Sequence, residues 1–301
     1  MVFVEYLRKK LSIPTAFAIR RLHSLTGLAF TLFVCEHLFT NSLSSSLLAE
    51  GKYFVWMVDG FHKIPGLKVI EICLLALPFG LHAVVGIKYA LEAKFNSVKH
   101  GNDHPHCNFE RNHAYSWQRI TAWFLLVGIL LHVVHMRFME YPRKITLDDR
   151  NYYLVTLNES VSSKKIIDTL SLGVVSPSKD VISSGNFSLN QIEKLASDLQ
   201  VKDFLDGLKD QWVVVASSAG QAFLVIVRKS FTSVFMSLLY SMLVLTAVYH
   251  GFNGLWSFTV RWGIIISQKK QMLFLKYAFV LMLGVAFLGL FAVWGTYWSS
   301  K

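Results

Sequence analysis

Charged residues and cysteines are both scarce in this chain of 301 residues. Asp, Glu, Lys and Arg together make up 16% of the sequence, against 53% hydrophobic residues, and the mean hydropathy is +0.43. This composition excludes an ordinary soluble globular domain of the same size and predicts a protein embedded in a membrane. The three cysteines offer neither a disulfide framework nor paired metal-ligand spacing. Residues 1–21 lack a short apolar core followed by a small-residue cleavage site, so no cleaved signal peptide is expected.

Five stretches are long and apolar enough to cross a bilayer, which requires about 20 mostly apolar residues in a helix. They are residues 22–43, 68–93, 117–139, 232–260 and 273–297. All five should be helices, because lipid does not tolerate unpaired backbone groups. Pro78 frees the carbonyl of Leu74 and predicts a kink in the second span.

The segment between the third and fourth spans has a different composition. Residues 140–231 carry acidic and basic side chains in nearly equal numbers, which is typical of a small soluble unit. Strands are predicted at Tyr152–Leu157, Trp212–Ser217 and Ala222–Val227, and a capped amphipathic helix at Ser188–Leu199. A turn at Ser217–Gly220 would join the last two strands as a hairpin.

The expected architecture is an all-α membrane protein with a small α/β insert. Residues 1–139 would hold the N-terminal segment and the first three spans, residues 140–231 the insert, and residues 232–301 the last two spans. The N-terminal segment and the second and fourth connections hold thirteen Lys and Arg, against four in the short segments on the other side. Because cytoplasmic loops retain basic residues, the N-terminus is predicted to be cytoplasmic and the insert and C-terminus external. The net charge of +11 is thus attributed to orientation on anionic lipid, and no nucleic-acid partner is expected.

Five of the eleven histidines lie in the predicted spans. They are His37 in the first, His82 in the second, His132 and His135 in the third and His250 in the fourth. Histidine is costly in a membrane and usually faces a bundle interior or a cofactor. Four helices that each offer an imidazole have the arrangement needed to hold two haems b, each with one ligand from two helices. The alternative for any single histidine is an interhelical hydrogen bond.

Depth in the membrane suggests how these histidines pair. His37 and His132 lie about 8–9 Å from the external helix ends, counted at 1.5 Å per residue. His82 and His250 lie about 17–18 Å from the internal ends. The first pair would therefore hold an outer haem and the second an inner haem. His135, three residues round the helix from His132, is the alternative outer ligand.

Three glycines lie one helical turn from His82, His132 and His250. They are Gly86, Gly128 and Gly254. A flat macrocycle beside the imidazole needs such a gap, although glycines in membrane helices also serve helix packing.

Polar residues near the span ends are candidates for contacts with the haem propionates. Arg261 lies eleven residues after His250 on nearly the same face, where it would bind a propionate or anchor the helix in the membrane. Ser24 and Trp117 lie at the cytoplasmic ends of their spans and could donate hydrogen bonds there. Helix capping and interfacial anchoring explain these two almost as well.

Two acidic residues are candidates for proton transfer at a quinone site. Glu36 adjoins His37, and Glu71 lies near the external end of the second span, so both are expected near the outer haem. The alternative is that these carboxylates pair with Lys68 or Arg137 at the interface.

The connection between the second and third spans is rich in histidine. His100, His104, His106, Cys107 and His113 occur there without the paired spacing of a structural zinc site. We expect a solvated cytoplasmic contact surface rather than a metal site.

Four regions together resemble the five-helix, dihaem cytochrome b anchor of succinate dehydrogenase and fumarate reductase. They are RRLHSLTG (20–27) with CEHLFTN (35–41), LPFGLHAVVGIKYA (77–90), SWQRITAWFLLVGILLHVVHMR (116–137) and YHGFNGLWSFTVRWG (249–263). They occur in the family's order and cover essentially all of the membrane part. The resemblance implies axial ligands at His37, His82, His132 and His250. It selects His132 over His135, because the family's ligand is followed five residues later by a basic residue.

The resemblance also implies the function and the partners. Propionate contacts would fall on His23 and Ser24, an interfacial aromatic on Trp117 and a basic contact on Arg261. Such anchors sit in the bacterial cytoplasmic membrane and bind a flavoprotein and an iron-sulfur subunit at its cytoplasmic face. They pass electrons from succinate through both haems to a quinone, often menaquinone, and are not catalytic alone. The long insert and Glu36 depart from the family's pattern.

Three alternatives remain from the sequence. The same anchor architecture serves fumarate reductases that run in reverse. A second alternative is a cytochrome b of a hydrogenase or formate dehydrogenase, which matches the motifs less well. From a different class, the buried histidines and acids would relay protons in a membrane transporter, although the inverted repeats and broken helices frequent in that class are not seen.

Overall fold

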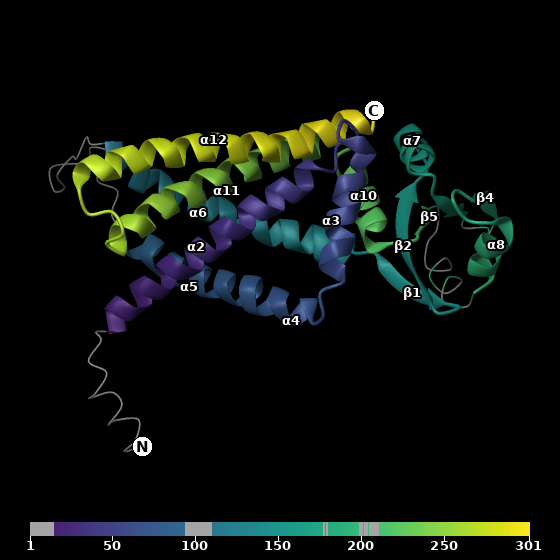
Figure 1. Cartoon of the computed structure of the whole chain (residues 1–301), viewed down its shortest axis with the longest axis horizontal. Coiled ribbons are helices and arrows are strands. Elements are labelled where there is room, and N and C mark those ends of the chain that lie inside the picture. Colours follow the sequence, from purple (N-terminus) through teal and green to yellow (C-terminus); the bar gives the residue numbers. More distant parts are fainter. Residues whose placement is uncertain are drawn as a thin grey trace, which may run out of the picture. The chain divides into compact units, whose positions relative to one another are not determined.

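The computed structural model describes residues 15–93, 110–176, 178, 180–198, 201, 204 and 211–301. Five helices in this part of the chain are long and apolar enough to cross a membrane. They are α2 (Thr15–Ser42), the continuous run of α4 (Leu67–Glu71), η2 (Ile72–Ala76) and α5 (Leu77–Glu92), the run of α6 (Glu110–Val133) and η3 (Val134–Met139), α11 (Val234–Arg261) and α12 (Gln268–Ser299). The five spans expected from the sequence are therefore confirmed as helices (Figure 1).

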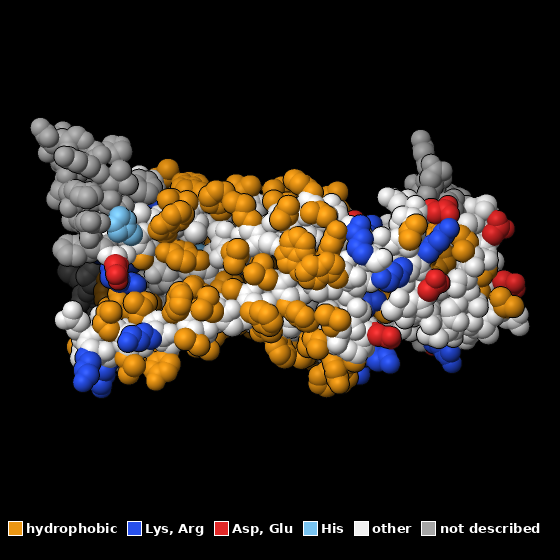
Figure 2. Space-filling model, turned by 90° about the horizontal axis from the view of Figure 1, so that it is seen from above, with side chains coloured by type: hydrophobic (Ala, Val, Ile, Leu, Met, Phe, Trp, Pro, Cys, Tyr) orange, Lys and Arg blue, Asp and Glu red, His pale blue; other side chains and the backbone are white. Residues whose placement is uncertain are grey.

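Hydrophobic side chains gather on the outer surface of these helices (Figure 2). Leu32 is 62% exposed, Val84 69% and Phe235 71%. In a soluble protein such a surface would be an aggregation hazard, whereas in a bilayer it faces lipid.

A kink is predicted near Pro78, and the structure has a π-helical turn just before this residue. Pro78 has no N–H to donate to the Leu74 carbonyl. The chain widens over η2 just before the proline, and the Leu77 N–H donates to the Ile72 carbonyl, five residues back. A wider turn of this kind keeps the helix continuous around the missing donor.

The chain divides into two compact units. The first unit comprises Met1–Cys35, Lys68–Leu126 and Thr246–Leu283, and the second comprises Glu36–Leu67, Val127–Leu245 and Gly284–Lys301. Each unit therefore contains parts of several spans. In the second unit, a five-stranded sheet accompanies the helical segments.

The sheet has the order β1-β2-β5-β3-β4, and all neighbours are antiparallel. The strands are β1 (Arg143–Leu147), β2 (Arg150–Asn158), β3 (Gly173–Val175), β4 (Val181–Ser183) and β5 (Gln211–Ala216). The accompanying helices are α7 (Val161–Leu170), α8 (Leu189–Ser197) and α10 (Ala219–Ser230). The strands expected at Tyr152–Leu157 and Trp212–Ser217 are confirmed as β2 and β5, although β5 ends at Ala216, one residue earlier than expected.

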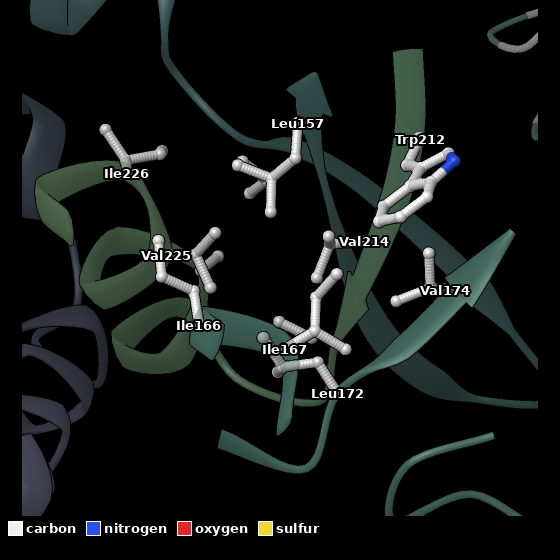
Figure 3. Packing of buried hydrophobic residues seen from close by; sticks show 12 residues of the cluster. Leu157, Ile166, Ile167, Leu172, Val174, Trp212, Val214, Val225 and Ile226 are labelled. Atoms are coloured by element: carbon white, nitrogen blue, oxygen red, sulfur yellow. The ribbon is translucent and has the colours of Figure 1, made fainter. Parts of the chain in front are cut away.

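Apolar side chains cover both faces of the sheet, as the alternation of side chains along a strand dictates. On β5, Trp212 and Val214 point to the side of α7 and α10, where they join a cluster with Ile166 and Val225 (Figure 3). Val213, between them, points to the side of α8 and joins the second cluster. The sheet therefore lies between two hydrophobic layers.

The helix expected at Ser188–Leu199 is confirmed as α8. Its N-terminus has a complete capping box, in which the Ser188 side chain accepts from the Gln191 N–H and the Gln191 side chain accepts from the Ser188 N–H. This reciprocal pairing satisfies two donors that a helix start leaves unpaired.

The predictions of a strand at Ala222–Val227 and of a hairpin turn at Ser217–Gly220 are wrong. These residues belong to α10, which begins after Ser218 because the Ser218 hydroxyl accepts a hydrogen bond from the Gln221 N–H. Val225 packs toward the sheet while Leu224 packs toward α3 (Lys52–His62). A helix buried on both sides produces the same unbroken apolar run as a buried strand, which explains the error.

The helix α3, which the sequence analysis missed, packs closely against α10. The Gly220 N–H donates to Asp59 Oδ1 at 2.7 Å, and a side chain at Gly220 would collide with the Val55 backbone. Arg228, only 1% exposed, donates to the Glu50 carbonyl at 3.0 Å. Burial lowers the pKa of its guanidinium, an effect that Glu50 opposes. These contacts attach α10 firmly to the connection that follows the first span.

Replacing Gly220 with alanine is expected to loosen this contact. The new Cβ meets the Val55 backbone, which cannot rotate away as a side chain would, so the expected cost is about 1–3 kcal/mol. Thermal unfolding and limited proteolysis in detergent would measure it. Gly60→Ala is the matched control, because a Cβ at this exposed position of α3 meets nothing within 4 Å. Equal stability of the two variants would contradict the prediction.

Candidate functional site

Two buried histidines face one another in the first unit. His82 on α5 and His250 on α11 have ring centres 6.3 Å apart, with an angle of 82° between the ring planes. His23 on α2 stacks on the His82 ring at 4.0 Å, and Tyr89 meets the edge of His23. The structure thus places together the two histidines that depth assigned to the inner pair.

Hydrogen bonds at Nδ1 hold both rings of this inner pair. His82 Nδ1 lies 3.0 Å from the His23 carbonyl, and His250 Nδ1 lies 3.1 Å from Thr121 Oγ1. The Thr121 hydroxyl is itself 2.8 Å from the Trp117 carbonyl, to which it donates. Its oxygen therefore accepts from the His250 ring. With Nδ1 occupied in both rings, Nε2 is the nitrogen available for a metal.

A second histidine pair lies in the second unit. His37 on α2 and His132 on α6 have ring centres 6.0 Å apart and an interplanar angle of 81°. His132 Nδ1 lies 3.2 Å from the Tyr240 hydroxyl, and His135 Nδ1 lies 3.1 Å from the same oxygen. Asn41 approaches His37 Nε2 at 3.4 Å, which is long for a hydrogen bond. The outer pair expected from depth is therefore also adjacent.

The spacing of both pairs fits one metal ion between two imidazoles. Two metal–nitrogen bonds of about 2 Å, added to the short distance from each nitrogen to its ring centre, span about 6 Å. Among the described residues, no group of three or more His, Cys, Asp and Glu side chains could hold a metal. Sites with two protein ligands suit haem iron, because the macrocycle supplies the other four nitrogens.

The glycines beside the histidines divide into two kinds. A Cβ at Gly27 would lie 2.7 Å from His82 Cε1, and one at Gly86 would lie 3.4 Å from His23 Cε1. These two residues leave room for the inner rings. A Cβ at Gly128 would instead lie 2.8 Å from Leu243 Cδ1, so this glycine serves helix packing, the alternative considered for it.

Buried polar atoms without a hydrogen-bond partner in the described part of the chain include three nitrogens of the first unit, His23 Nδ1, Arg111 Nε and Trp256 Nε1. The Arg111 guanidinium also lies over the Trp256 ring, 3.2 Å from its centre. Buried polar atoms are costly when unsatisfied, and nitrogens of this kind suit an anionic ligand.

The residues predicted to contact propionates or to transfer protons differ in their exposure and contacts. Ser24 is half-buried on α2, and the Trp117 side chain is 56% exposed on α6. Arg261 is exposed at the end of α11, and its carbonyl accepts from Arg21. Glu36 is exposed, and its Oε1 accepts from the Thr40 hydroxyl at 2.7 Å.

The structure also describes Glu71 and one residue of the histidine-rich connection. Glu71 is half-buried at the end of α4. In the histidine-rich connection, His100, His104, His106 and Cys107 lie outside the described residues, whereas His113 is on α6.

Five helices that could cross a membrane, with two histidine pairs between them, define a multi-pass membrane protein. No family model matches the chain. Over 278 residues the chain is 21% identical to the succinate dehydrogenase cytochrome b558 subunit of Bacillus subtilis (strain 168). The matched region covers 92% of this chain and 95% of that protein. The comparison supports the family expected from the motifs, because the chain is similar over most of its length to a succinate dehydrogenase cytochrome b subunit.

The third span offers two histidines, and only one is expected to be essential. His132 faces the His37 ring, whereas His135 contacts Tyr240. We therefore expect His132→Ala to remove one haem and His135→Ala to retain two. Haem content and the reduced-minus-oxidised spectrum of each purified variant would measure this. The reverse pattern would reassign the ligand to His135.

Proposed function

We propose that this chain is the cytochrome b membrane anchor of a succinate dehydrogenase. The observation that carries the proposal is the presence of two interhelical histidine pairs in a chain similar over most of its length to such a cytochrome b subunit. The ring centres within the two pairs are 6.0 and 6.3 Å apart. In this proposal His82 and His250 hold the inner haem b, and His37 and His132 hold the outer one. The comparison favours neither the fumarate reductase nor the transporter alternative.

The residues around each pair support electron transfer rather than ligand activation. When bound, each haem accepts and releases single electrons. Each haem would be held by two histidines, which would leave its iron no open site for oxygen or substrate. The His23 carbonyl and the Thr121 hydroxyl fix the ring orientation of the inner ligands, which limits rearrangement between oxidation states.

The buried donors of the first unit would hold the propionates of the inner haem. Arg111 Nε, Trp256 Nε1 and His23 Nδ1 are buried nitrogens without a hydrogen-bond partner among the described residues. We propose Arg111 and Trp256 in this role in addition to His23, Ser24, Trp117 and Arg261. Charge-assisted hydrogen bonds between these nitrogens and the propionates would compensate for the burial of the donors and of the carboxylates.

The basic residues support an orientation and a docking face. The N-terminus would be cytoplasmic, and flavoprotein and iron-sulfur subunits would bind on that side, where Lys and Arg concentrate. The insert and the C-terminus would lie outside. A quinone, menaquinone in this proposal, would bind near the outer haem, with Glu36 and Glu71 as candidate proton donors.

Succinate-driven reduction of the haems in the assembled complex tests this function. Anaerobic membranes that contain the chain and its partner subunits would receive succinate and then a soluble quinone. Haem absorbance should rise on the first addition and fall on the second. Reduction by dithionite but never by succinate would contradict the proposal.

A further inference from the structure

The hydroxyl of Tyr240 joins two histidines of the third span. Tyr240 lies on α11 and is 8% exposed, and its oxygen lies 3.2 Å from His132 Nδ1 and 3.1 Å from His135 Nδ1. Phe231 packs edge-on against the Tyr240 ring, with ring centres 5.2 Å apart. The phenol is therefore held in place by packing as well as by hydrogen bonds.

The number of protons at this oxygen fixes the direction of both hydrogen bonds. A phenol can donate one proton and also accept. A histidine that binds iron through Nε2 carries its proton on Nδ1, so His132 donates to the Tyr240 oxygen. Tyr240 then donates its own proton to Nδ1 of His135. The result is a chain of two hydrogen bonds that leads from the ligand to His135.

We propose that Tyr240 is a positioning residue that sets the reduction potential of the outer haem, and that His135 accepts the hydrogen bond that the Tyr240 hydroxyl donates. This inference rests on the proposed function. An acceptor at Nδ1–H makes a histidine ligand more basic, which favours ferric iron and lowers the potential. Because Tyr240 donates onward to His135, its oxygen becomes a better acceptor for His132.

The first unit offers a matched comparison. Thr121 Oγ1 accepts from His250 Nδ1 at 3.1 Å and donates to the Trp117 carbonyl at 2.8 Å. This is the same arrangement with a backbone carbonyl in place of His135. Each haem thus has its own hydroxyl acceptor, and each hydroxyl can be removed separately.

An optical redox titration of the complete protein tests the role of Tyr240. Tyr240→Phe should raise the potential of one haem component and leave the other unchanged, while Thr121→Val should raise the other component. His135→Leu should raise the same component as Tyr240→Phe by a smaller amount. All three variants should retain six-coordinate, low-spin spectra, because no axial ligand is altered.

Unchanged potentials in Tyr240→Phe, or equal shifts of both components, would overturn the proposal. If Tyr240→Phe loses the outer haem, His135→Leu decides, because a rise of that component supports the proposal and an unchanged potential contradicts it. A wild-type protein without two haems would overturn the proposed function itself. Two haems with no shift in the variants would overturn only the role of Tyr240.

Discussion

Alanine in place of His250 is expected to remove one haem, leave the other, and abolish succinate-driven quinone reduction. The His250 ring faces His82 at 6.3 Å, and a methyl group cannot replace its nitrogen as a ligand. His82→Ala should remove the same spectral component, because in the proposed site both histidines would hold one iron. Haem per chain and the reduced-minus-oxidised spectrum would measure both variants.

A histidine outside the pairs provides the control for this experiment. The Nδ1 atom of His62 on α3 lies 2.9 Å from the Val58 carbonyl oxygen, and the His62 ring contacts Phe223. Because His62 belongs to neither pair, His62→Ala should retain both haems. Loss of different components in His82→Ala and His250→Ala would show that these two residues do not share an iron.

Leucine in place of Gly27 is expected to displace the His82 ring and weaken binding of the inner haem. The new Cβ would lie 2.7 Å from His82 Cε1 and 3.1 Å from His82 Nδ1, the atom that contacts the His23 carbonyl. Overpacking of this kind costs about 1–3 kcal/mol, which corresponds to a loss of affinity of roughly 5- to 150-fold. Haem titration followed by absorbance would measure this change.

Gly284 on α12 gives the matched substitution, since a Cβ there meets nothing within 4 Å. Gly284→Leu should leave both haems in place. Gly27→Leu with the haem content and affinity of the wild type would contradict the assigned contact between Gly27 and His82.

The spans and the histidine pairs could be anticipated because their signals are local. A run of about 20 apolar residues identifies a membrane helix without knowledge of its neighbours. Counting residues from each helix end was also enough to place His37 with His132 and His82 with His250. Pro78 likewise marks its own irregularity, because the missing N–H is a property of one residue.

The contacts that surround the histidines could not be anticipated in the same way. Thr121 and His250 are 129 residues apart in the sequence, and Tyr240 and His132 are 108 apart. Their meeting depends on how each helix is rotated about its axis. A polar Thr121 inside an apolar span and Gly27, four residues after His23, were available signals of a functional position. Neither residue indicates in the sequence which histidine it contacts.

The insert shows a different limit of sequence patterns. The strand β2 has nine residues rich in aromatic and β-branched side chains, which is enough to recognise it, whereas β3 and β4 have only three residues each. In α10 the run from Leu224 to Val227 is apolar throughout because the helix is buried between the sheet and α3. Periodicity carries no information in such a run, so only tertiary contacts distinguish the helix from a strand.

The haem content of the purified wild-type chain tests the central claim most directly. The protein would be isolated from cells supplied with haem, and its haem would be extracted and quantified against protein mass, together with a reduced-minus-oxidised spectrum. Two haems b per chain, with the spectrum of low-spin iron bound by two histidines, are expected. A folded, five-helix protein without haem would contradict the claim that the two histidine pairs are its ligands.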